Sequence, residues 1–106
     1  MKLLFDQGTP VPLRKYLLSH VVETAYERGW NDIQNGELLN RAEAAGFDAL
    51  ITTDQNLRYQ QNMTGRRISI VALMTTSWPR IKSHVTTVAQ IIDALQPGSY
   101  LEVPIP

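Results

Sequence analysis

Residues 47–53, FDALITT, are the stretch that most constrains how this chain can fold. The run is short, apolar at its centre and followed directly by Asp54, which is typical of a β-strand buried on both faces. Such a strand needs helices packed on both sides of its sheet, and α/β proteins with parallel sheets supply them. We therefore expect residues 47–53 to form a central strand that ends at a carboxylate.

The rest of the chain alternates strand-like and helix-like segments, which predicts one domain over residues 1–106. We expect a three-layer α/β/α fold around a mainly parallel sheet of four or five strands. Expected strands cover residues 3–5, 20–24, 47–53, 68–74 and 100–105, the last at an edge because it contains Pro104. One helix is expected over residues 12–19, and a second between a cap at Asn35 and its end at Gly46. A third, of about 18 residues, is expected after a Thr75-Thr76-Ser77 cap. Its apolar stripe consists of Ile81, Val85, Val88, Ile92 and Leu95.

Composition excludes several classes of protein. The chain has no cysteine, which rules out disulfides and thiolate chemistry, and its two histidines, His20 and His84, are too few for a histidine-rich zinc site. No apolar run reaches the roughly 20 residues of a membrane span, and the N-terminus does not match a signal peptide. We expect a cytoplasmic protein that does not bind membranes.

Three acids are predicted to meet at one edge of the sheet. Asp6 and Asp54 follow expected parallel strands, and Glu37 lies in the first turn of the helix that leads into the third strand. The carboxyl ends of parallel strands and the N-termini of the following helices share an edge, so the three can converge. Clustered carboxylates repel one another unless a cation neutralises them, and Mg²⁺ or Mn²⁺ suits such a site.

Each acid also has a structural explanation. Asp6 can close its own turn through an Asx hydrogen bond. Glu37 can stabilise the positive end of its helix, and Asp54 can cap a turn over residues 55–60. These alternatives stay open at the level of the sequence.

Three segments, LLFDQGTPVPLRKYL, NGELLNRAEAAGFDALITTDQNL and ISIVALMTTSWPRI, together resemble the small PIN-like proteins, predicted nucleases related to the VapC toxins of bacterial toxin–antitoxin pairs. The resemblance covers essentially the whole chain. It implies a PIN-type fold and Mg²⁺- or Mn²⁺-dependent cleavage of RNA, with Asp6, Glu37 and Asp54 as the metal-binding and catalytic acids. It also implies an antitoxin protein as partner and allows a homodimer.

If that function holds, the acids bind one or two ions that activate a water for in-line attack on the phosphodiester. Thr53 and Asn56, beside Asp54, are then the expected auxiliary residues. The second half of the chain has no acid between Asp54 and Asp93, and its cations are expected to contact the RNA backbone. These cations are Arg58, Arg66, Arg67, Arg80 and Lys82.

Two departures from the family pattern support an alternative. Gly8 and Asn56 stand where relatives often have a polar ligand and a further acid. The alternative is a catalytically degenerate PIN-like domain that binds RNA or a partner protein without cleavage. Tyr59 and Trp78 are candidates for stacking on bases, although packing is the favoured explanation for Trp78, and Trp30 is expected to pack or to form an interface. A phosphoacceptor domain with a nucleophilic aspartate is a third reading, but no lysine falls at the tip of a strand.

Overall fold

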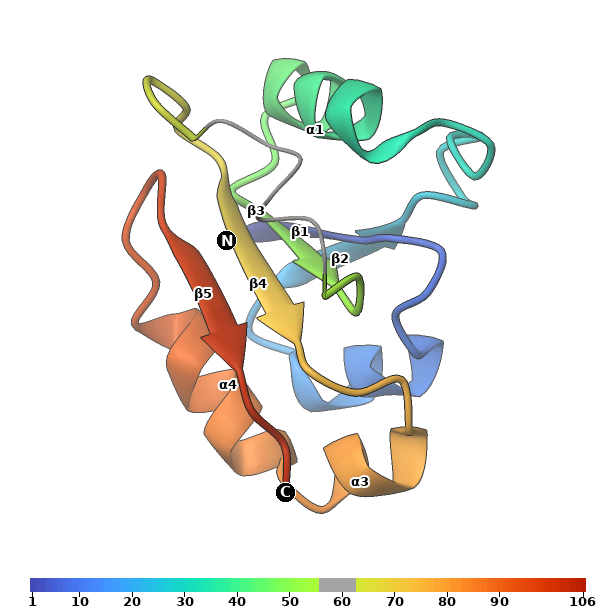
Figure 1. The fold of residues 1–106 in the computed structure, drawn as a ribbon, viewed down its shortest axis with the longest axis vertical. Coiled ribbons are helices and arrows are strands. Elements are labelled where there is room, and N and C mark those ends of the chain that lie inside the picture. The colour runs from blue at the N-terminus through green and yellow to red at the C-terminus, as the bar shows by residue number, and fades with distance from the viewer. Residues whose placement is uncertain (56–62) are drawn as a thin grey trace.

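The computed structural model describes residues 1–55 and 63–106, which build helices around one five-stranded sheet (Figure 1). All neighbouring strands are parallel, in the order β2-β1-β3-β4-β5. The strands are β1 (Lys2–Phe5), β2 (Val21–Thr24), β3 (Ala49–Thr52), β4 (Ser69–Leu73) and β5 (Tyr100–Val103). The predicted parallel sheet and the edge position of the last strand are both confirmed.

Helices cover both faces of the sheet. They are the 3-10 helix η1 (Val11–Tyr16) and the α-helices α1 (Asn35–Ala44), α3 (Trp78–Lys82) and α4 (Val85–Asp93). Figure 1 shows α1 on one face and α3 and α4 on the other. The core is accordingly split in two. Leu4 and Leu50 pack in one cluster with Leu39 of α1, whereas Leu3 and Ile51 pack in the other with Val88 of α4.

The central strand β3 is buried along its whole length, as predicted. Leu50 and Ile51 are inaccessible to solvent and point to opposite faces. Burying a side chain of this size stabilises the fold by about 1.5–3 kcal/mol. The side chains of this short apolar strand therefore pack against helices on both faces of the sheet.

The predicted long helix after β4 is wrong, because it is divided into α3 and α4. Ser77 caps α3 as predicted, and its hydroxyl accepts a hydrogen bond from the backbone amide of Arg80. At the break, the Ser83 hydroxyl donates to the carbonyl of Pro79 and His84 leaves helical geometry. Side chains that bond to their own backbone compete with helix continuation. Ile81 and Val88 stay buried on the same core despite the break.

The start of α1 and the length of η1 also differ from expectation. Asn35 is the first residue of α1, and Gln34 occupies the capping position without a side-chain hydrogen bond. The predicted helix over residues 12–19 is the shorter η1, and the chain leaves helical geometry at Leu17. Gly46 has φ of 83° after α1, a left-handed conformation that confirms its predicted role in ending the helix.

The direction of the chain across the sheet reverses beside β1. The first crossover places β2 on one side of β1, and the next places β3 on the other. Ligands of open parallel sheets bind outside the carboxyl ends of the strands at such a switch point. The edge formed by the ends of β1, β2 and β3 is therefore where a site is expected. In the described part of the chain, no helix has the length and apolar character needed to cross a membrane.

Candidate functional site

Asp6 lies directly after β1 and its carboxylate is held by two hydroxyls. Oδ1 accepts a hydrogen bond from Thr9 Oγ1 at 2.7 Å, and Oδ2 accepts one from Thr52 Oγ1. The backbone carbonyl of Asp6 accepts from the amide of Thr9 at 3.2 Å, which closes the turn. The side chain thus organises the loop that follows the strand, the structural role considered above as its alternative.

Burial raises the pKa of the Asp6 carboxyl above its ordinary value of 3.8. Hydrogen bonds from Thr52, from Thr9 and from the backbone amide of Gly8 act in the opposite direction, because they stabilise the charged form. Desolvation is the larger effect. The fold therefore binds the Asp6 proton more tightly than the unfolded chain does.

This pKa predicts how an Asp6→Asn variant will behave. A folded-state pKa above the unfolded one means that the contribution of Asp6 to stability is complete below pH 3.8 and is lost as the pH rises through the folded pKa. The variant lacks that loss. We therefore expect the free energy of unfolding of the variant, relative to that of wild type, to increase from about pH 3.5 to about pH 7. Urea unfolding of both proteins at about five pH values in this range measures the difference. A difference between the two proteins that is independent of pH would contradict this.

Asp54 follows β3 and is paired with the start of α1. Asn35 Nδ2 donates to Asp54 Oδ2 at 2.6 Å. The backbone amide of Asp54 donates to Thr52 Oγ1 at 3.0 Å, and the same hydroxyl donates to Asp6. Thr52 thus connects the ends of two neighbouring strands, and Asn35 joins them from the helix.

Glu37, the third predicted acid, lies elsewhere. Its carboxylate pairs with Arg41 Nε at 3.1 Å, one turn further along α1, and its side chain is exposed. Successive residues of a helix are about 100° apart, so Glu37 faces away from the direction of Asn35. The helix therefore brings the side-chain amide of Asn35 to Asp54, and not the carboxylate of Glu37 that the sequence suggested.

Thr53 and Gly8 contact each other across the turn. Thr53 Oγ1 donates to the carbonyl of Gly8 at 3.1 Å. A Cβ at position 8 would lie 2.8 Å from that hydroxyl oxygen, which is closer than packed atoms allow. This close approach explains why glycine stands at position 8. The predicted auxiliary residue Thr53 fixes the loop through this bond, and Asn56 lies outside the described residues.

The residues present do not fit a metal site of three carboxylates. Within residues 1–55 and 63–106, no three histidine, cysteine or acidic side chains lie close enough to hold an ion. Residues 56–62 contain none of these residue types. Asp6 and Asp54 come to the same edge, but their oxygens accept hydrogen bonds from Thr9, Thr52 and Asn35.

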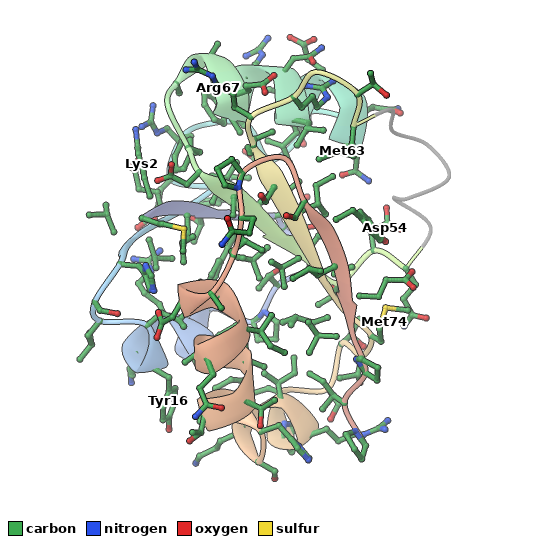
Figure 2. All side chains as sticks on the ribbon, turned by 90° about the vertical axis from the view of Figure 1, so that its left-hand side faces the viewer. Lys2, Tyr16, Asp54, Met63, Arg67 and Met74 are labelled. Atoms are coloured by element: carbon green, nitrogen blue, oxygen red, sulfur yellow. The ribbon has the colours of Figure 1, made fainter. Side chains whose placement is uncertain are left out.

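Among the described residues, the predicted RNA-binding cations do not all lie at this edge. Arg66 and Arg67 precede β4, so they lie at the opposite end of the sheet from Asp54 (Figure 2). Arg66 contacts Glu43 and Asn40 of α1. On α3, Arg80 donates to the carbonyl of Ile105 at 2.8 Å, and Lys82 is exposed. Arg58 lies outside the described residues.

The aromatic candidates serve packing where the structure describes them. Trp78 packs against Tyr16 with ring centroids 6.0 Å apart. Trp30 meets Phe47 edge to face at 6.4 Å, which agrees with the packing role expected for it. Tyr59 lies outside the described residues.

Two pockets open at the carboxyl edge and share Asp6 and Gln7. The smaller, of about 110 Å³, contains Asn35 and Trp30 among its lining residues. The larger, of about 410 Å³, is lined by Asp6, Gln7, Thr9, Val11, Arg14, Thr24, Tyr26 and Glu27. The arrangement offers a binding surface at the switch point. Sequence reasoning missed Asn35 and Tyr26 as site residues, although the Thr24-x-x-Glu27 pattern signals a fixed turn around Tyr26.

Comparisons of the chain with models of protein families, with curated proteins and with solved structures found no match.

Proposed function

We propose that the protein is a PIN-like domain that binds single-stranded RNA at the carboxyl edge of its sheet without cleaving it. The observation that carries this proposal is the hydrogen bond between Asn35 and Asp54. Where metal-dependent cleavage would need a further carboxylate, the chain presents an amide that is already bonded to the acid. The proposal takes the second of the two functions suggested by the family resemblance.

Cleavage by a metal-activated water requires ions held by several oxygen ligands with negative charge. Asp6 is held by hydroxyls, Asp54 by an amide, and Glu37 by Arg41. An amide adds no negative charge to offset that of a divalent ion. The proposed function therefore includes no cleavage at this site.

Two features of the edge support binding. The pockets lie at the switch point of a parallel sheet, where α/β proteins bind their ligands. The loops there are held by hydrogen bonds within the chain, such as Thr53 to Gly8, so little order needs to be gained on binding.

The test is incubation of labelled structured and unstructured RNA with wild type and with Asp6→Asn, in Mg²⁺, in Mn²⁺ and in EDTA. We expect the unstructured RNA to be bound and to stay intact under all three conditions. Metal-dependent cleavage that the Asp6→Asn variant abolishes would refute the proposal and restore the nuclease. Cleavage that both proteins show equally would indicate a contaminating ribonuclease, and a second purification would remove it.

A further inference from the structure

We infer that the larger pocket holds one unpaired nucleobase, which stacks on Tyr26 and contacts the side-chain amide of Gln7. This inference rests on the proposed function and names the part of the RNA that this pocket recognises. Its basis is the exposure of Tyr26, the internal pairing of the charged groups of the pocket and the rigidity of the turn that carries the ring.

Tyr26 is an aromatic residue that the fold leaves in solvent. It is 75% exposed, although it follows the fully packed end of β2, and it lies beside a pocket of about 410 Å³. Val11 of η1, also exposed, provides an apolar side chain in the lining of the same pocket. A nucleobase in the pocket could lie against the Tyr26 ring and the Val11 side chain. Stacking of a base on an aromatic side chain is the usual way in which proteins bind single strands.

The carboxylates of the pocket and the two terminal nitrogens of Arg14 have partners within the chain. Arg14 pairs with Glu27 at 2.6 Å, and the Asp6 carboxylate accepts from Thr9 and Thr52. An incoming phosphate would have to compete with Glu27 for Arg14 and would approach the carboxylate of Asp6. A neutral ligand meets neither cost, which favours a base over the RNA backbone in this pocket.

Gln7 supplies the polar contact that a base needs. It is exposed and lines both pockets at the edge. A side-chain amide presents both donors and an acceptor, so it can bond to the edge of any base. The pocket is therefore expected to be tolerant of sequence.

The turn that carries Tyr26 is fixed before any ligand binds. The backbone amide of Thr24 donates to Glu27 Oε1 at 2.9 Å, and the amide of Glu27 donates to Thr24 Oγ1 at 3.0 Å. This reciprocal pair is a capping box. The backbone amide of Ala25 donates to the carbonyl of Phe5 in β1, and the amide of Trp30 donates to the carbonyl of Ala25, each at 2.8 Å. A ring on such a support loses little freedom when a base stacks on it.

The experiment is a fluorescence polarisation titration of a labelled single-stranded RNA with wild type, Tyr26→Ala, Tyr26→Phe and Leu18→Ala. We expect Tyr26→Ala to weaken binding about tenfold or more, and Tyr26→Phe to retain it because the ring remains. Leu18 is 86% exposed and does not line the pocket, so Leu18→Ala is the matched control and should bind as wild type does. Circular dichroism checks that each variant is folded.

The dependence on salt separates stacking from loss of a phosphate contact. Because no charge is removed, Tyr26→Ala should keep the wild-type slope of log affinity against log salt concentration. If wild type binds the RNA and Tyr26→Ala binds it equally well, the base pocket is refuted while the proposed function stands. If wild type binds no single-stranded RNA, the proposed function itself fails and the pocket inference with it.

Discussion

An Asn35→Asp variant will be less stable than wild type in EDTA and will be stabilised by Mn²⁺, whereas wild type will not. The substitution replaces the donor of the 2.6 Å hydrogen bond to Asp54 with a second carboxylate. Loss of a hydrogen bond to a charged group costs about 1.5–3 kcal/mol, and repulsion between the two carboxylates adds to this. The variant then has three carboxylates at one edge of the sheet, from positions 6, 35 and 54, and a divalent ion relieves their repulsion.

Thermal unfolding followed by circular dichroism, in EDTA and in increasing MnCl₂, measures both effects. Asn40→Asp is the matched control, because it makes the same change of charge on an exposed position of the same helix. It should show no specific response to Mn²⁺. If Mn²⁺ raised the melting temperature of wild type as much as that of Asn35→Asp, wild type would already bind the ion, and the argument against cleavage would fail.

A Thr52→Val variant will lose about 2–4 kcal/mol of unfolding free energy, because one buried hydroxyl serves two partners. Thr52 has no solvent-accessible surface; its hydroxyl donates to Asp6 and accepts from the backbone amide of Asp54 at 3.0 Å. Valine keeps the shape but leaves a desolvated carboxylate and a backbone amide without this partner. The same change should raise the pKa of Asp6 further, since a hydrogen bond from Thr52 is the largest of the effects that lower it.

Urea unfolding at pH 7 measures this loss, with two variants for comparison. Thr52→Ser keeps the hydroxyl and should retain most of the stability. Thr53→Val removes one neutral hydrogen bond, to the carbonyl of Gly8, and should cost about 1 kcal/mol. If Thr52→Val and Thr53→Val lowered the free energy of unfolding equally, the hydroxyl that links Asp6 to Asp54 would contribute no more to stability than an ordinary neutral hydrogen bond.

Local patterns predicted most of the fold. The strand around Ile51, the helix that ends at Gly46 and the cap at Ser77 all occur where hydrophobic spacing and end signals placed them. The long helix after β4 failed as a prediction because the apolar stripe continues across the break at His84, and a stripe alone does not report a change of helix axis. Hydrophobic spacing records which residues face the core, and that information is local.

The candidate site was only partly predictable. Asp6 and Asp54 come to one edge because the ends of parallel neighbouring strands must do so. Arg66 and Arg67 illustrate the opposite case, since they are close to Asp54 in sequence but lie across the sheet, at the start of the next strand. Charge clusters read along the chain therefore say little about which charges share a surface.

The amino-acid sequence was sufficient to predict a parallel α/β sheet with two aspartates at its carboxyl edge, because burial on both faces leaves a continuous apolar run and parallel strands end together. The identity of the group that meets Asp54 depended on tertiary structure. The rotation of α1 about its axis places Asn35 there and turns Glu37 toward Arg41, and the register of β3 places Thr52 beside Asp6. Helix rotation and strand register are set by packing of the whole core, so no segment taken alone contains them.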